Sequence, residues 1–384
     1  MINREMSGYI KKLKTQFPVI AIVGPRQSGK TTLIKECFKN YKYFNLENPD
    51  TLVQIESDPG GFMRNNKEKV IIDEVQKYSK LMSYLQVYSD EIGKMGNFVI
   101  SGSENLLLSE KISQSLAGRA AYATLLPLTI AESKAKNYYD CIFYGGYPGL
   151  ISKKLDPLEF YNQYINTYVE RDAKQIVNIR NLSLFRKLLF LLAGRVGSII
   201  NYNSLANEIG VDHKTIEGWL SVLETTYVIY KLQPFYENFG KRYIKSAKIY
   251  FTDTGLVCRL LGIQKSTELQ TNNMTGHLFE NLIIANTLKH FFNSGKRNNL
   301  YFFRDTVGNE VDLIIESGNA LSVCEIKSAY TYNKVFEKGL TYFEQIIKSS
   351  RYKLLDKNVI YTGDSFTTGN VKVIKWSEYM SGSH

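Results

Sequence analysis

The sequence of 384 residues has few cysteines, few prolines and no long hydrophobic run. Its cysteines, Cys37, Cys141, Cys258 and Cys324, lie far apart, without the close pairs of a zinc site or of a disulfide-rich secreted protein. With 8 Pro and 27 Gly, the chain is neither collagen-like nor of low complexity. No apolar stretch approaches the roughly 20 residues that a bilayer-spanning helix needs. We therefore expect a folded cytoplasmic protein that has no membrane partner.

The N-terminal residues 1–17 mix charges with spaced apolar residues and lack the continuous apolar core of a signal peptide, so we expect no export. Of all residues, 44% are hydrophobic and 22% are charged, as in ordinary globular proteins. Because a domain usually takes roughly 100–200 residues, the length predicts two or three domains.

Positive charge exceeds negative charge, with 48 Lys and Arg against 37 Asp and Glu, a formal net charge of +11. Part of this excess is local, because 10 basic and 5 acidic residues lie between Arg180 and Tyr250. Such a balance favours an anionic partner such as DNA, although it does not identify one.

The first third of the chain alternates short β-rich runs with helical stretches. This order predicts a parallel sheet with helices on both faces, which is an α/β fold. The expected strands are residues 18–24, 42–46, 69–73, 97–101 and 120–126. After them the pattern becomes helical. Residues 144–150, rich in glycine, predict a loop, and a long helix is expected over residues 276–292.

Residues 24–31, GPRQSGKT, match the phosphate-binding pattern G-x-x-x-x-G-K-[ST] between an apolar strand and a helical run. Gly24 and Gly29 permit a tight loop whose backbone N–H groups converge on phosphate oxygens. The following helix presents its positive end to the same anion. Lys30 is expected to reach the β- and γ-phosphates, and Thr31 to supply a hydroxyl to Mg²⁺. The predicted ATP-binding residues are Gly24, Pro25, Arg26, Gln27, Ser28, Gly29, Lys30, Thr31, Thr32 and Asp73.

A second motif supports the first. Residues 70–74, VIIDE, form an apolar strand that ends in two carboxylates. Asp73 is expected to hold Mg²⁺ through water, and Glu74 to polarise the attacking water. At the end of the next strand, Ser101 and Ser103 are placed to contact the γ-phosphate or that water. Together the motifs predict an ATPase with ATP and Mg²⁺ as cofactors.

Two arginines, Arg119 and Arg171, are candidates for the positive charge that stabilises phosphoryl transfer. Either could act in the same chain or on a neighbouring subunit, and the second case requires a homo-oligomer. A lone arginine is more often a surface or salt-bridge residue, so this alternative stays open.

Residues 201–232 have the pattern of a helix-turn-helix, with Gly210 at the turn and Asp212 as the N-cap of the second helix. The inward-facing residues expected on that helix are Ile216, Leu220 and Leu223. Residues 226–235 then alternate like the wing of a winged helix. The solvent face of the second helix is polar but not strongly basic, so DNA binding and protein contact remain alternatives. A basic stretch at residues 241–248 would suit phosphate contacts.

Near the C-terminus, Asp312 lies thirteen residues before Glu325, and Lys327 follows two positions later. Strand positions 325 and 327 share one face, and a hairpin would bring Asp312 beside Glu325. Two carboxylates can bind Mg²⁺ while a lysine orients or deprotonates water, and Glu280 on the predicted helix adds a third carboxylate. The spacing predicts a restriction-endonuclease-like core. Its alternatives are metal-dependent cleavage and buried structural ion pairing.

These residues together resemble a bacterial and archaeal family of AAA-type P-loop ATPases whose C-terminal region has a winged helix and a restriction-endonuclease-like domain. Further matching stretches are SLAGRA (115–120), YGGYPG (144–149), YVERD (168–172), LLAGRVG (191–197) and KRYIKSAKIYFTDTGL (241–256). The resemblance implies a parallel sheet of the additional-strand type, a catalytic Glu74, and Ser101 or Ser103 as sensor. It places Asp253 in a family signature to which we assign no chemistry.

The expected domains are an ATPase core (1–135), a helical lid or linker (136–180), a winged helix (181–240) and a mixed α/β nuclease-like domain (241–384). We interpret the chain as an ATP-dependent switch that acts on DNA. The alternative is a signalling or chaperone-like ATPase that binds a protein partner and has an inactive nuclease-like domain.

Overall fold

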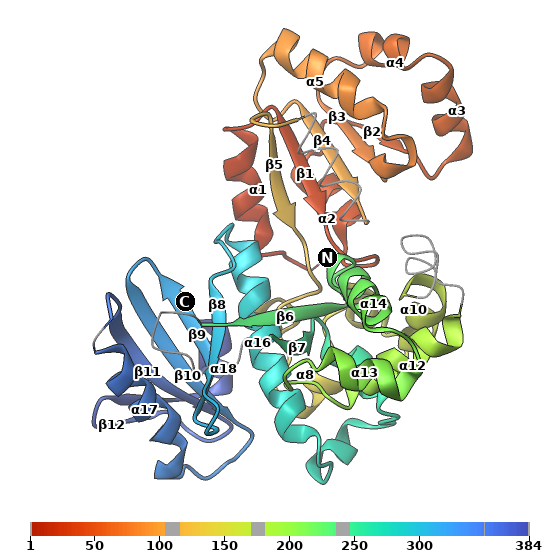
Figure 1. The fold of residues 1–384 in the computed structure, drawn as a ribbon. Helices are drawn as coiled ribbons and strands as arrows, with labels where there is room; N and C mark the ends of the chain where they lie inside the picture. Colours follow the sequence, from red (N-terminus) through yellow and green to blue (C-terminus); the bar gives the residue numbers. More distant parts are fainter. Residues whose placement is uncertain (1, 104–115, 170–180, 236–245, 349, 383–384) are drawn as a thin grey trace.

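The structure is a computed structural model that describes residues 2–103, 116–169, 181–235, 246–348 and 350–382. Figure 1 shows an N-terminal α/β part above, a C-terminal sheet at the lower left and a helical region at the lower right. Helix α16 (Thr275–Asn293) lies where these parts meet. Among the described residues, no helix has both the length and the apolar character that crossing a membrane demands.

The first sheet has five strands among the described residues, in the order β2-β3-β4-β1-β5. They are β1 (Val19–Val23), β2 (Lys42–Asn45), β3 (Val70–Asp73), β4 (Phe98–Gly102) and β5 (Ala120–Thr124). All neighbouring strands are parallel, and β1, β3 and β4 are buried along their whole length. Burial on both faces explains their nearly continuous apolar sequences. The predicted parallel sheet is confirmed, with β4 inserted between β1 and β3.

Helices cover both faces of this sheet. Alternate residues of β1 enter different cores, with Val19, Ala21 and Val23 on one face and Ile20 and Ile22 on the other. The first face packs against α3 (Pro49–Ser57), α4 (Pro59–Asn65), the 3₁₀ turn η1 (Val75–Tyr78) and α5 (Leu81–Ile92). The second packs against α1 (Met6–Lys14) and α2 (Lys30–Cys37). The period-two alternation of a strand produces this division.

A helical segment follows the first sheet. It contains α7 (Ile130–Ser133), α8 (Tyr138–Tyr144), α9 (Pro148–Lys153), α10 (Pro157–Tyr164), a π-helical turn (Ile165–Val169) and α12 (Leu182–Ala193). Proline at the first helical position starts α9 and α10, where its missing N–H is not needed. The loop predicted over residues 144–150 is therefore shorter, because α8 ends at Tyr144 and α9 begins at Pro148.

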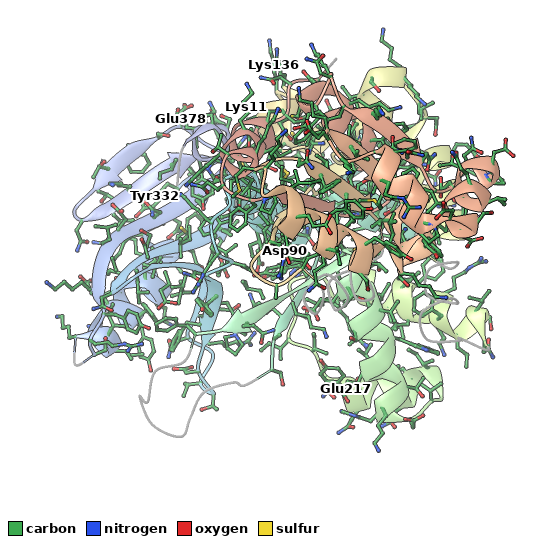
Figure 2. The ribbon with its side chains drawn as sticks, turned by 90° about the horizontal axis from the view of Figure 1, so that it is seen from above. Lys11, Asp90, Lys136, Glu217, Tyr332 and Glu378 are labelled. Carbon is green, nitrogen blue, oxygen red and sulfur yellow. The ribbon has the colours of Figure 1, made fainter. Side chains whose placement is uncertain are left out.

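The next helices agree with the predicted local pattern. Helix α13 (Tyr202–Ile209) ends at Gly210, whose φ of 86° is left-handed, and the Asp212 side chain caps α14 (His213–Thr225). The predicted inward-facing residues of α14 are buried: Ile216, Leu220 and Leu223. Figure 2 shows Glu217 of α14 on the outside of the molecule. These features confirm the helix pair and its caps, whereas a winged-helix domain stays a prediction.

The second sheet has eight strands among the described residues, in the order β12-β13-β11-β10-β9-β8-β6-β7. They are β6 (Ile229–Pro234), β7 (Lys248–Phe251), β8 (Leu300–Arg304), β9 (Glu310–Ser317), β10 (Ala320–Lys327), β11 (Lys353–Tyr361), β12 (Phe366–Thr368) and β13 (Val371–Lys375). Residues 226–235, expected to form the wing, contain the single strand β6. Because β6 pairs with both β7 and β8, it belongs to the C-terminal sheet. The limit proposed at residue 240 lies between β6 and β7, and the domain limits stay predictions.

Helices surround this sheet, and the core between it and the helical segment is continuous. They are α15 (Thr254–Leu260), η3 (Ser266–Gln270), α16, η4 (Lys334–Glu337), α17 (Lys338–Ile347) and α18 (Trp376–Ser381). Helix α16 is buried on nearly all sides, including polar side chains such as Asn281, Asn286 and Lys289. A helix that is buried all round belongs to the interior, so α16 joins parts of the chain rather than covering one of them.

Candidate functional site

The predicted phosphate-binding loop connects β1 to α2 at the carboxyl end of β1. Gly24 and Gly29 both have positive φ, 150° and 93°. A Cβ atom on Gly24 would lie 2.2 Å from the carbonyl oxygen of Leu125, so the loop needs glycine there. The Lys30 ammonium donates to the carbonyl oxygens of Gly24 and Pro25, each at 2.9 Å. The loop is thus closed around the side chain expected to bind phosphate.

Asp73 ends β3 beside this loop and is 3% exposed. The Thr31 hydroxyl donates to Asp73 Oδ2 at 2.7 Å, and Ser101 donates to Oδ1. Tyr43 on β2 also donates to Oδ2 at 2.7 Å. Burial, followed by the contact with Asp73, raises the pKa of Tyr43. The structure therefore brings together Thr31 and Asp73, the two residues expected at Mg²⁺. It places Ser101, which was expected at the γ-phosphate or the attacking water, on Asp73, and it adds Tyr43, which the sequence reasoning missed.

Glu74 follows directly, with a left-handed φ of 56°. This conformation costs a non-glycine residue about 1–3 kcal/mol and is typical of functional sites. Gln76 donates to Glu74 Oε2 at 2.5 Å, and Ser103 donates to the same oxygen at 3.2 Å. Within the described residues, the buried Oε1 atom of Gln76 has no hydrogen-bond partner. Gln76 was not predicted to take part in the site. The only feature of the sequence that pointed to it was its position two residues after Glu74.

A cavity of about 490 Å³ lies over the loop, which is in the size range of small-molecule sites. Its polar side is lined by Arg26, Gln27, Gly29, Lys30, Thr31, Thr32, Glu47 and Glu74. Its other side comes from α9, α10 and the turn between them: Pro148, Gly149, Ser152, Lys153, Leu155 and Phe160. The remaining predicted loop residues, Gly24, Pro25 and Ser28, are not among the lining residues. The cavity thus pairs a polar loop with a partly apolar wall.

Of the two predicted arginines, Arg119 does not complete this site within the chain. Arg119 precedes β5 and its carbonyl oxygen accepts from the Val19 N–H at the start of β1, whereas the loop follows the other end of β1. The Arg119 guanidinium pairs with Asp90 at 2.5 Å. A role for Arg119 on a neighbouring subunit stays a prediction. Arg171 lies outside the described residues.

Family models match three consecutive parts of the chain. Residues 16–134 match the AAA domain family, and two domains of unknown function, DUF8612 and DUF4143, match residues 135–267 and 275–379. The uncharacterized protein Rv2008c of Mycobacterium tuberculosis is 30% identical over 333 residues, which is 86% of this chain and 74% of the relative. This chain belongs to the same family. Its N-terminal part is an AAA-type P-loop ATPase domain that binds nucleotide.

Two further comparisons find similarity at lower identity. The uncharacterized protein MJ1544 of Methanocaldococcus jannaschii is 24% identical over 404 residues, covering 95% of this chain and 86% of the relative. A solved structure of a Walker-type ATPase of Pyrococcus abyssi aligns with 68% of this chain and 96% of its own at 14% identity, with a TM-score of 0.45. The matches to residues 135–379 carry no assigned function, so the winged-helix and nuclease-like domains stay predictions.

Asp253, from the family signature, has a positioning role that the structure makes plain. It is 1% exposed and caps α15 by accepting from the N–H groups of Gly255 and Leu256. It also accepts from the Gly146 N–H at 2.7 Å and from the Tyr161 hydroxyl at 2.6 Å. Asp253 therefore anchors the loop that leads into α9, one wall of the nucleotide cavity.

The predicted nuclease-like residues also meet in space. Strands β9 and β10 pair antiparallel, and Asp312 Oδ2 accepts from the Ile326 N–H at 2.8 Å. Lys327 lies 2.6 Å from Glu325 Oε1 and 3.5 Å from Asp312 Oδ2. Lys327, whose side chain is 36% exposed, is thus paired with both carboxylates, an arrangement common to both alternatives.

A second lysine, Lys248 of β7, enters the same cluster and was not predicted. Its ammonium lies 3.0 Å from Glu280 Oε1 and 4.0 Å from Asp312 Oδ1, and it pairs with Glu310. Burial lowers the pKa of Lys248, but the surrounding carboxylates raise it more, so the lysine stays charged. We call Lys248, Glu280, Glu310, Asp312, Glu325 and Lys327 the lysine–carboxylate cluster.

This cluster has two lysines against four carboxylates, and Arg304 adds a third cation 3.1 Å from Glu310. Burial and then Asp312 raise the pKa of Glu325 to about 8, while Lys327 works in the opposite direction. Burial likewise raises the pKa of Glu280, opposed by Lys248. Over the described ranges, no three or more His, Cys, Asp or Glu side chains are grouped so that they could hold a metal ion. The cluster as it stands is an ion-pair network.

Proposed function

We propose that this protein binds and hydrolyses ATP and acts as a nucleotide-dependent switch. The observation that carries the proposal is the meeting of Thr31, Asp73 and Glu74 beside the loop cavity. The loop N–H groups and Lys30 would bind the phosphates, with Lys30 exchanging its loop carbonyl partners for phosphate oxygens. The partly apolar wall around Leu155 and Phe160 suits the base of the nucleotide.

Thr31 and Asp73 fit a magnesium ion. Both offer oxygen atoms, and Mg²⁺ in nucleotide enzymes is held by one or two such groups together with the phosphates. Their oxygens lie 2.7 Å apart, with Thr31 on α2 and Asp73 at the end of β3. The bound ion would neutralise charge on the phosphate oxygens. Tyr43 and Ser101 orient the Asp73 carboxylate, since both donate to it.

Glu74 is the general base in this proposal. Its carboxylate reaches the cavity, while Gln76 and Ser103 fix one of its oxygens. The other oxygen can then accept a proton from the attacking water. Ser103 thus acts on the water through Glu74, and Ser101 acts on the magnesium ligand Asp73.

Glu74→Gln is expected to lower the rate of ATP hydrolysis at saturation by at least about 100-fold, because general base catalysis contributes that much or more. The dissociation constant of ATP is expected to stay within about threefold, since Glu74 polarises water and does not bind phosphate. Phosphate release and isothermal titration calorimetry measure the two quantities. Glu91→Gln, an exposed residue of α5, is the matched control. Hydrolysis that survives in Glu74→Gln would remove Glu74 from this role.

The switch would act through α16. One half of this helix contacts the N-terminal part, where Asn286 accepts from the Ile130 N–H at 2.8 Å and Lys289 donates to the Leu128 carbonyl at 3.2 Å. The other half contacts the C-terminal sheet, where Asn281 bonds the N–H and C=O of Phe251 and Glu280 bonds Lys248. A stiff helix held at both ends is suited to carry a change at the nucleotide to the second sheet.

We propose DNA as the partner on the basis of charge. The net charge of +11 and the local excess between Arg180 and Tyr250 favour a polyanion. Fluorescence anisotropy with a labelled duplex is expected to show affinity falling at least tenfold between 50 and 200 mM salt, because each phosphate contact releases counterions. Binding that ignores salt would contradict DNA as the partner.

The alternative is a signalling or chaperone-like ATPase whose nuclease-like domain is inactive and which binds a protein. One observation favours inactivity. Lys248, which is not part of the expected nuclease constellation, lies 3.0 Å from Glu280 and is 2% exposed. Its ammonium group supplies positive charge to Glu280 and Glu310 from within the protein.

A further inference from the structure

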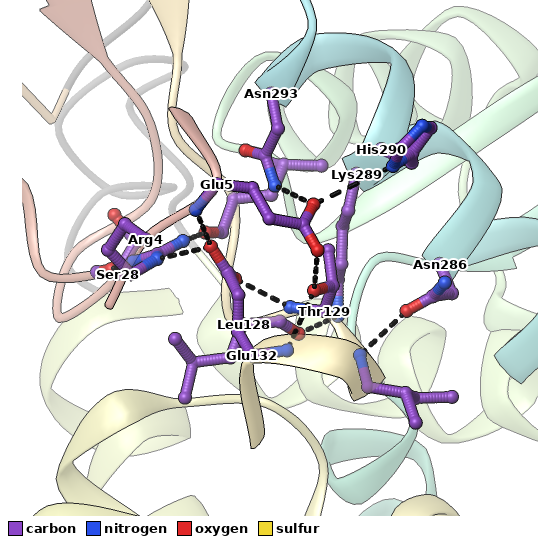
Figure 3. Close-up of polar contacts among 12 residues, drawn as sticks. Arg4, Glu5, Ser28, Leu128, Thr129, Glu132, Asn286, Lys289, His290 and Asn293 are labelled. Atoms are coloured by element: carbon purple, nitrogen blue, oxygen red, sulfur yellow. Dashed lines mark hydrogen bonds and ion pairs between the residues drawn. The ribbon is translucent and has the colours of Figure 1, made fainter. Parts of the chain in front are cut away.

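Arg4 lies behind the phosphate-binding loop, on the segment that precedes α1. It is 6% exposed, and its guanidinium donates in three directions (Figure 3). Nη1 donates to the Ser28 carbonyl at 2.7 Å, Nη2 to the Leu126 carbonyl at 2.8 Å, and Nε to Glu132 Oε1 at 3.0 Å. One side chain therefore holds the loop, the chain after β5 and α7 together.

The positive charge of Arg4 is neutralised by Glu132, whose side chain is 2% exposed. Glu132 is fixed in turn, because it forms a capping box with Thr129 and accepts from the Glu5 N–H at 2.7 Å. A buried guanidinium needs both a counter-charge and acceptors for its N–H groups, and this site supplies them. The rigid fork of arginine, unlike a lysine ammonium, can address these groups in fixed directions.

The contact with Ser28 sets the direction of a peptide plane in the loop. A trans peptide is planar, so its C=O and the N–H that follows point in opposite directions. Arg4 holds the Ser28 carbonyl at the back of the loop, which turns the Gly29 N–H the other way. Gly29 lines the nucleotide cavity and Ser28 does not. The N–H of Gly29 is thereby presented to an anion in the cavity.

We propose that Arg4 is a positioning residue for ATP binding, acting through the Ser28 carbonyl on the Gly29 N–H. The inference rests on the proposed function, since it needs a phosphate in the loop. It extends the nucleotide site to a segment outside the AAA domain match, which begins at residue 16. The same segment contacts α16 through Glu5, which accepts from Asn293 at 3.2 Å. Arg4 thus contacts the loop while its neighbour Glu5 contacts α16, the helix proposed to carry the switch.

Titration calorimetry with ATP and Mg²⁺ tests this role in the full chain. Arg4→Ala is expected to raise the dissociation constant of ATP at least tenfold, and Arg4→Lys at least threefold. The hydrolysis rate at saturating ATP is expected to stay within threefold, because Arg4 does not touch the attacking water. This split between affinity and rate distinguishes positioning from a general loss of folded protein, which lowers the rate and leaves the affinity of the remaining protein unchanged. Arg64→Ala, with a side chain 64% exposed, is the surface control.

ATP binding by the wild type distinguishes a failure of the proposed function from a failure of the role of Arg4 alone. A wild-type chain that binds no ATP overturns the proposed function and with it the role of Arg4. A wild-type chain that binds while folded Arg4→Ala binds equally well overturns the role of Arg4 alone. Should Arg4→Ala fail to fold by circular dichroism, Arg4→Lys decides, and a wild-type dissociation constant in that variant overturns the inference.

Discussion

Lys30→Ala is expected to weaken ATP binding by at least about 100-fold. The Lys30 ammonium is 6% exposed and is held inside the loop by the carbonyls of Gly24 and Pro25. In the bound state it would face two phosphate groups, and hydrogen bonds to charged groups contribute about 1.5–3 kcal/mol each. Two such contacts amount to a factor of about 100 or more in affinity. Titration calorimetry with ATP and Mg²⁺ measures the loss directly.

Lys39→Ala is the matched control for this change. Lys39 is exposed and follows α2, so its removal takes away one positive charge without touching the loop. Its effect on affinity is expected to stay within about threefold, because exposed charges are screened by salt. Binding by Lys30→Ala within threefold of the wild type would contradict a phosphate site in this loop.

The nucleotide site was largely predictable because its parts are local. Each motif consists of a few consecutive residues. One is a glycine loop between a strand and a helix, and the other is a carboxylate at the end of a strand. A parallel sheet then brings the ends of β1, β3 and β4 to one edge, which explains why Thr31, Asp73 and Ser101 meet. The position of Arg119 follows from the same rule, since a residue before a parallel strand lies at the opposite edge.

The unpredicted residues share a different property, because their contacts depend on packing between distant segments. Arg4 reaches Ser28 and Glu132 from a segment that has no motif of its own. Tyr43 meets Asp73 only because β2 pairs with β3. Lys248 lies in a basic stretch that would suit phosphate contacts at the surface, but as part of β7 it is buried. In each case the sequence shows the chemical type of the side chain, but it does not show which distant residue the side chain contacts.

Lys248→Met is expected to lower the free energy of unfolding by about 3–5 kcal/mol, because it leaves a buried carboxylate without its counter-charge. Methionine keeps most of the side-chain volume, so the loss reports charge rather than a cavity. Glu280 would lose its cation, whereas Glu310 would keep its pair with Arg304 at 3.1 Å. Denaturant unfolding followed by circular dichroism measures the change. Lys372→Met, which breaks an exposed pair with Asp356, is the control and is expected to cost no more than about 1 kcal/mol.

A double variant sharpens this test and bears on the function of the C-terminal sheet. If the loss in Lys248→Met comes from unpaired charge, adding Glu280→Gln should recover part of it, because the second change removes the stranded carboxylate. An equal stability of Lys248→Met and wild type would show that the lysine does not hold the cluster together.

If the lysine–carboxylate cluster has only a structural role, these variants are expected to change the stability of the protein and no activity. A catalytic one requires that the wild type nick plasmid DNA with Mg²⁺ and that Asp312→Ala lose this activity, because Asp312 would be a metal ligand.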